Sequence, residues 1–143
     1  MNSGAPIGPH WLAFDIGGTK ADVAVVSSDG VLEARGRVSV PGNGHLIDEV
    51  ITLARRLGEG FHVVGAGVAT AGPLFDHGQR VSPLNIPQWR EFPLRDLLEA
   101  SLEIPVRVDG DVRALALAER RFGGAKELDH YASLVVSTRG GGA

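Results

Sequence analysis

The chain has 143 residues, of which 43% are hydrophobic and 22% charged, and its formal net charge at pH 7 is −3. This length suits one domain, and the composition excludes a disordered or membrane-spanning chain. Because there is no basic run, signal peptide or long apolar segment, we expect a cytoplasmic protein without nucleic-acid or membrane partners. The absence of cysteine excludes disulfides, thiolate catalysis and thiolate zinc sites.

The first half of the chain alternates between strand and helix patterns. Segments rich in β-branched and aliphatic residues at 11–16, 21–27 and 31–40 predict three antiparallel strands, separated by the turn sequences GGTK and SDG. Apolar residues at helical spacing then predict a helix over 43–58, which Gly58 ends. A fourth strand is predicted over 61–69.

The second half begins with a region rich in glycine and proline, residues 70–89, which predicts loops with a small hairpin. The later predicted elements are a helix over 94–102, a strand over 106–109, a helix over 111–122 closed by Gly123 and Gly124, and a strand over 131–137. The order βββαβαβα predicts an α/β fold with a mixed sheet and helices on its faces. This order is found in the actin-like ATPase, or ribonuclease H-like, half-domain.

The sequence DIGGTK, residues 15–20, joins the first two predicted strands. Asp15 ends an apolar strand, where a carboxylate is costly unless it is paired or bound to a cation such as Mg²⁺. The two glycines can expose backbone N–H groups, and the threonine and lysine add a hydroxyl and a positive charge. The stretch is therefore either a grip for the β- and γ-phosphates of a nucleotide or a plain hairpin with solvated charges, and alone it favours neither.

Asp111 stands where a predicted strand ends and a helix begins. Aspartate is a favoured N-cap, which is the structural interpretation of this position. The same position aims a carboxylate from the carboxyl edge of the sheet, where it could accept the proton of a substrate hydroxyl during phosphoryl transfer. Asp109 lies two residues earlier and is a competing candidate.

Two loop sequences could line a substrate pocket. The segment 65–75 resembles a dinucleotide fingerprint, but Thr70 replaces its third glycine and Pro73 forbids the helix that should follow. A glycine-lined floor beside a pocket is favoured instead, with a plain loop as the alternative. In SPLNIPQW, Asn85 could bind hydroxyls and Trp89 could stack on a sugar, or the stretch is simply a loop stiffened by prolines.

Five segments, taken in chain order, resemble the ROK family, which is named for repressors, open reading frames and kinases. They are FDIGGTKADVAVV, GVATAGPL, SPLNIPQW, VRVDGDVRALALAE and LVVSTRGGG, and together they extend from about residue 11 to 142. The resemblance implies an actin-like ATPase fold and an ATP-dependent kinase for a hexose or N-acetylhexosamine, of the bacterial glucokinase type.

The resemblance also implies a role for each matching position. The positions implied to bind ATP are Asp15, Gly17, Gly18, Thr19, Thr138, Gly140 and Gly141. Those implied to bind the sugar are Gly72, Asn85 and Asp111. Asp111 is implied to be the general base, and Asp15 to hold Mg²⁺ indirectly.

The chain also departs from the family pattern. Gly110 replaces the asparagine expected before the catalytic aspartate, and Arg139 replaces a small residue in the second phosphate loop. The family continues into a second lobe with a zinc site, so we expect 1–125 to be an N-terminal lobe and 126–143 the start of a truncated second lobe, without zinc. We expect these residues alone to be inactive, because half of the cleft is absent.

Other roles remain open at this point. A non-catalytic fragment and a sugar-sensing ROK regulator without its DNA-binding domain are the two alternatives to a kinase. A surface left uncovered by a missing lobe would favour association, so a homo-oligomer is also an expectation.

Overall fold

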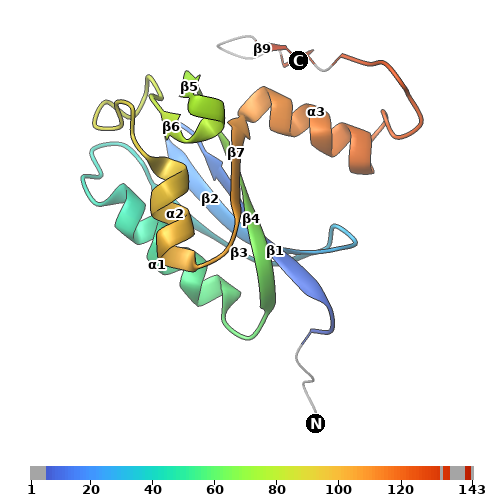
Figure 1. Ribbon diagram of the computed structural model, residues 1–143, viewed down its shortest axis with the longest axis horizontal. Helices are drawn as coiled ribbons and strands as arrows, with labels where there is room; N and C mark the ends of the chain where they lie inside the picture. Colours follow the sequence, from blue (N-terminus) through green and yellow to red (C-terminus); the bar gives the residue numbers. More distant parts are fainter. Residues whose placement is uncertain (1–5, 133, 136–140, 143) are drawn as a thin grey trace.

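The computed structural model describes residues 6–132, 134–135 and 141–142. A five-stranded sheet with the strand order β3-β2-β1-β4-β7 forms its centre (Figure 1). These strands are β1 (Pro9–Ile16), β2 (Lys20–Ser27), β3 (Leu32–Ser39), β4 (His62–Thr70) and β7 (Val106–Gly110). The first three strands are antiparallel to one another, whereas β4 lies parallel to β1 and β7 parallel to β4. The predicted mixed sheet is therefore confirmed.

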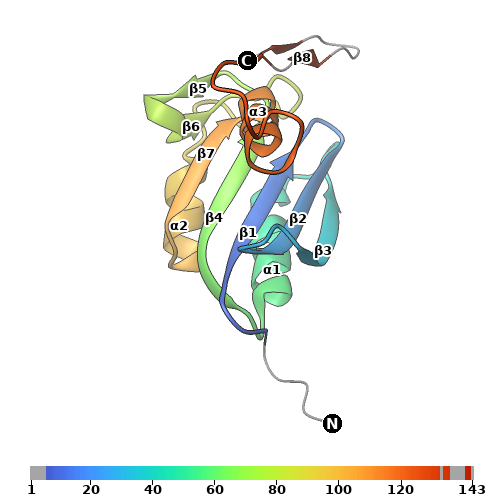
Figure 2. The ribbon, with the colours of Figure 1, turned by 90° about the vertical axis from the view of Figure 1, so that its right-hand side faces the viewer.

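The three α-helices lie on opposite faces of this sheet. Helices α1 (Leu46–Gly58) and α2 (Leu94–Leu102) cover one face, and α3 (Asp111–Phe122) lies against the other (Figures 1 and 2). Figure 2 shows that α3 crosses only one end of its face, so that much of β1 and β4 stays uncovered there. The predicted element order is confirmed, although α1 begins at Leu46 rather than at residue 43.

The face under α1 and α2 carries the hydrophobic core. In β1, alternate side chains point to opposite faces, and Leu12, Phe14 and Ile16 are all buried. Partners on the neighbouring strands continue this apolar layer, because residues in register share a face. The buried strand residues on this face include Ala21, Val23, Val25, Ala66, Val68, Val106 and Val108.

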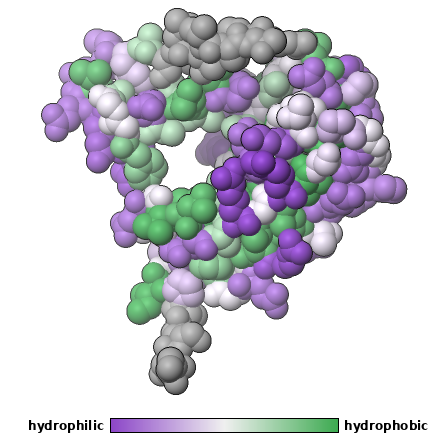
Figure 3. Space-filling view, turned by 180° about the vertical axis from the view of Figure 1, so that it is seen from behind, coloured by the Kyte–Doolittle hydropathy of each residue, from purple (hydrophilic) through white to green (hydrophobic). Residues whose placement is uncertain are grey.

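The opposite face is built from small and polar residues. Trp11, Ala13 and Asp15 of β1 lie beside Gly65, Gly67 and Ala69 of β4. Within α3, Ala116 is the one residue that is buried, so this helix is held loosely compared with α1 and α2. Seen from behind, the surface is hollowed near its centre, with hydrophobic and hydrophilic residues around the hollow (Figure 3).

Short elements complete the described chain. The predicted small hairpin is present as β5 (Leu74–Phe75) and β6 (Arg80–Val81), joined by the 3₁₀ turn η1 (Asp76–Gly78). The predicted last strand is observed only as β8 (Leu134–Val135), which pairs with β9 (Gly141–Gly142) in a separate sheet. Tyr131 and Ala132 lie outside any strand, and 133 and 136–137 lie outside the described residues.

No helix in the described part of the chain is long and apolar enough to cross a bilayer. The expected boundary near residue 125 stays a prediction.

Candidate active site

The loop of DIGGTK is a tight turn that ends at the same edge of the sheet as β4 and β7. The Gly17 N–H donates to the Lys20 carbonyl at 2.9 Å, and the Val40 N–H donates to the Thr19 carbonyl at 3.2 Å. The hairpin geometry is thus present. It is compatible with the phosphate grip, because the turn is fixed by its own backbone while Thr19 and Lys20 stay exposed.

Asn85 lies directly against this turn. A Cβ atom added to Gly18 would lie 2.6 Å from both the Cβ and the Nδ2 atoms of Asn85, so only glycine fits there. Two predicted site residues that are far apart in the sequence are therefore brought together. Asn85 itself is exposed, and its amide remains accessible to a ligand.

The end of β4 is tied to the end of β1 by Thr70. The Thr70 side chain is fully buried, and its hydroxyl donates to the Ile16 carbonyl at 3.3 Å. Gly72, which belongs to the predicted pocket floor, follows Thr70 by two residues. The floor therefore begins next to the hydrogen bond that joins Thr70 to the end of β1. The threonine that breaks the dinucleotide fingerprint thus has a structural role here.

Asp15 lies near the carboxyl end of β1, the middle strand of the sheet, in surroundings that disfavour its negative charge. Partial burial raises its pKa, and the nearby carboxylates of Asp22 and Asp111 raise it further, against the smaller lowering effects of Lys20 and Arg35. Because its pKa is raised in the folded state, ionised Asp15 costs the folded protein stability at neutral pH. The strand register, in which Asp15 is level with Ala69 and Ala69 with Asp109, places Asp15 and Asp111 at the same end of the sheet.

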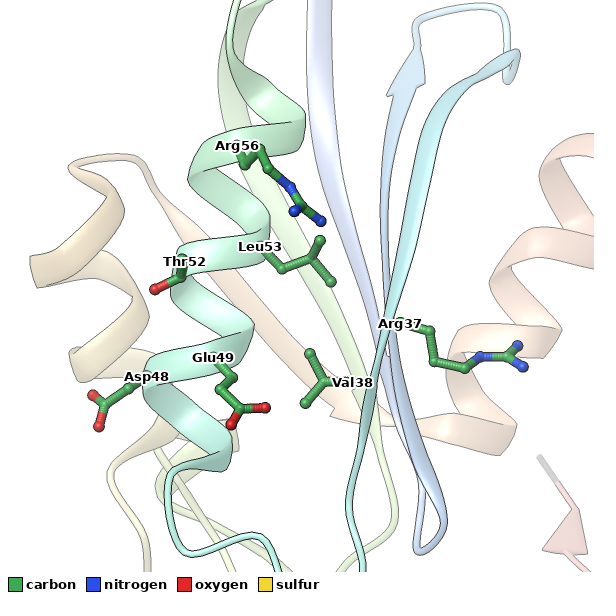
Figure 4. Close-up of a pocket in the computed structure, with 7 residues that line it drawn as sticks. All are labelled: Arg37, Val38, Asp48, Glu49, Thr52, Leu53 and Arg56. Carbon is green, nitrogen blue, oxygen red and sulfur yellow. The ribbon is translucent and has the colours of Figure 1, made fainter.

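Asp22 pairs with Asp15 across the hairpin, and two arginines of β3 neutralise it. Arg37 Nε lies 2.6 Å from Asp22 Oδ1, and Arg35 Nη2 lies 3.1 Å from Asp22 Oδ2. Hydrogen bonding from Arg37 lowers the pKa of Asp22. Figure 4 shows the Arg37 side chain pointing away from α1, while its neighbour Val38 points towards Leu53.

Sequence reasoning missed Asp22, although the hairpin register could have found it. A four-residue connection at 17–20 places Ile16 opposite Ala21 and therefore Asp15 opposite Asp22. Of the two aspartates, Asp22 forms ion pairs, whereas Asp15 forms none among the described residues.

The two aspartates around Gly110 differ in their partners. Asp109 accepts the Gly110 N–H at 2.8 Å and lies 3.6 Å from Arg113 Nε. Asp111 is exposed and accepts only the adjacent Val112 N–H, at 2.8 Å, and it makes no ion pair among the described residues. Asp111 is therefore the better placed of the two to accept a proton from a substrate.

The capping interpretation of Asp111 is wrong. Gly110 occupies the N-cap position of α3 and makes no side-chain cap, while Asp111 is the first helical residue. Strand β7 continues to Gly110, one residue further than predicted, and the helix begins at Asp111 as predicted. The Asp111 carboxylate therefore does not make the hydrogen bond of an N-cap residue.

Trp89 is not available to stack on a sugar. It is 2% exposed, and its ring stacks on Phe92 with centroids 4.5 Å apart. The tryptophan packs inward and anchors the loop that carries Asn85, so the expected sugar contact is wrong.

Part of the second phosphate loop lies outside the described residues. Thr138, Arg139 and Gly140 fall there, and their roles stay predictions. Gly141 is described and pairs with Val135 in the small sheet.

The carboxylates fit a metal ion that brings most of its own ligands. No group of three or more potential metal-binding side chains is present in the described ranges. Mg²⁺ typically takes one or two carboxylates together with waters and substrate phosphates. Asp15, whose negative charge is destabilised by neighbouring carboxylates, fits that need, so a Mg²⁺ ion would relieve its strain.

Comparisons with known proteins agree with this geometry. The sequence profile of the ROK family matches residues 11–143. The chain is 30% identical over 134 residues to a glucokinase of Streptomyces coelicolor, covering 92% of the chain and 42% of that protein. It is 33% identical over 136 residues to an N-acetylmannosamine kinase of Yersinia pestis, covering 92% of the chain and 45% of that protein.

A solved structure gives the same result. The ROK family glucokinase of Streptomyces griseus, in complex with glucose and AMPPNP, superposes with a TM-score of 0.81 at 31% identity. The match covers 93% of the chain and 43% of that structure. The chain thus spans less than half the length of the relatives it matches.

Proposed function

The chain belongs to the ROK family, and on this premise we propose that it is the N-terminal lobe of an ATP-dependent kinase that phosphorylates a hexose or an N-acetylhexosamine. The strand register carries the proposal, because Asp15 of β1 is level with Ala69 of β4 and Ala69 with Asp109 of β7, which puts Asp15 and Asp111 at the same end of the sheet. The kinases among the relatives and the glucose and AMPPNP complex support it. Because the relatives are more than twice as long, the proposal concerns this lobe's part in the reaction.

In this proposal the turn of β1 and β2 binds the nucleotide phosphates. The Gly18 N–H and the Thr19 hydroxyl would bind the β- and γ-phosphates, since the Gly17 N–H already donates to the Lys20 carbonyl, and Asp15 would hold Mg²⁺ through water. When bound, Mg²⁺ would neutralise charge on the phosphates. The fixed backbone of the turn supports this role, because it keeps these groups in place before the nucleotide arrives.

Asp111 acts on the other reactant. Its carboxylate accepts the proton of the sugar hydroxyl as the oxygen attacks the γ-phosphorus, and the bond from that phosphorus to the bridging oxygen of ADP breaks. Asn85 connects the nucleotide site with the sugar site. It contacts the phosphate turn at Gly18, and its exposed amide is free to bind a sugar hydroxyl. Gly110 supplies no side chain, so one sugar contact typical of the family pattern is missing.

A chimera tests the catalytic role. In it, residues 11–142 replace the matching segment of the Streptomyces coelicolor glucokinase, which supplies the rest of the cleft. We expect glucose phosphorylation, and we expect Asp111→Asn to lower kcat by roughly 10²- to 10⁴-fold, as for the loss of a general base. Asp109→Asn is the matched control and should lower kcat far less, since Asp109 is engaged by Arg113.

An unchanged kcat in the Asp111→Asn chimera would exclude the proposed base. Binding without turnover in the unmodified chimera would instead favour a non-catalytic, sugar-sensing role. If the chimera does not fold, Mg²⁺ and AMPPNP can be titrated into the 143-residue chain itself while its backbone amides are followed by NMR. Shifts at 17–19 that disappear in Asp15→Asn are the expected result.

A further inference from the structure

A cavity borders the open face of the sheet. Its volume is about 560 Å³, within the range of roughly 300–1,000 Å³ typical of small-molecule sites. Ala13 and Gly67 of the open sheet face and Leu117 of α3 line it, and it extends to β7, α2 and η1. None of the described residues that line it is among the predicted ATP or sugar ligands, but Phe14 directly precedes Asp15 and Asp109 lies two residues before Asp111, so the cavity adjoins the candidate active site.

Two arginines and a histidine from different elements line this cavity. Arg95 comes from the first turn of α2, Arg107 from β7 and His77 from η1, and all three line it. Residues so distant in sequence meet here only because η1 and α2 both lie beside β7. Two guanidinium groups at one cavity are well suited to a phosphoryl group, which they can bind through paired N–H donors.

Arg95 also has an unused donor. Its Nε atom is buried and has no hydrogen-bond partner, and the nearest carboxylate oxygen, on Asp96, lies 3.9 Å away. A buried N–H without a partner is uncommon, because it loses its hydrogen bond to water and gains nothing in return. An acceptor bound in the cavity would satisfy it.

The acidic group that faces the cavity is already engaged. Asp109 lines it, but its carboxylate accepts the Gly110 N–H and lies 3.6 Å from Arg113. The lining therefore carries two arginines against one aspartate. The small apolar floor at Ala13 and Gly67 leaves room for the carbon skeleton of a bound molecule.

The turn that carries His77 is held rigidly against β7. Asp76, His77 and Gly78 have positive φ angles of 50°, 55° and 84°. Gly78 has no room for a Cβ atom because the Val108 carbonyl lies against it. This close approach places η1, and with it the backbone of His77, directly against β7.

We propose that this cavity binds a phosphoryl group, either as inorganic phosphate or on a sugar phosphate, through Arg95 and Arg107. The site lies beside the proposed kinase site but does not depend on phosphoryl transfer. It would allow the lobe to respond to the concentration of a phosphorylated small molecule, independently of the nucleotide that the turn of β1 and β2 binds.

The test is an NMR titration of the ¹⁵N-labelled chain with inorganic phosphate, with glucose 6-phosphate and with uncharged glucose. We expect the Arg95 Nε–Hε signal to shift saturably with at least one of the phosphates and not with glucose. Equal affinities would identify the phosphoryl group alone as the ligand, and tighter binding of glucose 6-phosphate would identify the sugar phosphate. Both results support the site.

Three variants locate the binding. Arg95→Gln should weaken it at least tenfold, and so should Arg107→Gln, whose exposed position keeps the test valid if the first variant does not fold. Arg56→Gln, on the exposed surface of α1, is the matched control and should leave the affinity unchanged. The proposal is overturned if neither phosphate gives a saturable shift up to about 10 mM, if the shifts are confined to 17–19, or if both cavity variants bind normally.

Discussion

The two faces of the central sheet differ in what covers them and in the side chains they carry. Under α1 and α2, the strands present aliphatic residues such as Leu12 and Phe14 that are almost completely buried. On the other face, Trp11 is 39% exposed beside glycines and alanines, and α3 buries only Ala116. Figure 2 shows how little of this face α3 covers.

This difference separates stability from binding within one sheet. The covered face holds the hydrophobic core and fixes the strands in register. The edge and the open face then carry the carboxylates and arginines that would be costly inside a core. The proposed catalytic groups and the proposed phosphate cavity both lie on the side that contributes least to the core.

The largest expected effect is therefore a loss of stability on the covered face. Leu98 of α2 is fully buried, so Leu98→Ala should lower the free energy of unfolding by about 2–5 kcal/mol. Leu117 of α3 is 60% exposed, and Leu117→Ala should change the free energy of unfolding by less than about 0.5 kcal/mol. Urea denaturation followed by circular dichroism measures both, and similar losses would mean that α3 is as important to the core as α2.

A pair of glycines gives a smaller version of the same contrast. In β3, a Cβ atom at Gly36 would lie 2.6 Å from the Leu53 side chain of α1, so Gly36→Ala should destabilise the protein by about 1–3 kcal/mol. A Cβ atom at Gly67 would have no neighbouring atom within 4 Å, so Gly67→Ala should instead stabilise the protein by about 0.4–1 kcal/mol. Thermal unfolding of both variants checks the signs, and a destabilised Gly67→Ala would indicate that the open face is filled.

Features that depend on local pattern were predictable from the sequence. Segments rich in β-branched and aliphatic residues predict the strands, and glycine and proline mark the turns. The position of Asp111 at the junction of β7 and α3 follows from the same patterns. The hairpin register would also have revealed Asp22, because strand pairing is fixed by the length of the turn.

Features that depend on contacts between distant segments were not predictable. Trp89 was a candidate for stacking on a sugar because its ring is flat, but that ring is buried against Phe92. Likewise, no sequence spacing shows that Arg95 and Arg107 line one cavity, since α2 and β7 are placed by packing on the sheet. Tertiary packing decides both cases, and contacts between distant segments leave no periodic pattern in a single sequence.

The central claim is that Asp15 and Asp111 form one site at the carboxyl ends of strands β1 and β7. Titrating the Asp15 carboxyl by NMR, in the unmodified chain and in Asp111→Asn, tests this claim most directly. We expect a pKa above the ordinary value of about 3.9 in the unmodified chain, and a lower pKa in Asp111→Asn, because one neighbouring negative charge is removed. An ordinary pKa that Asp111→Asn leaves unchanged would contradict the claim.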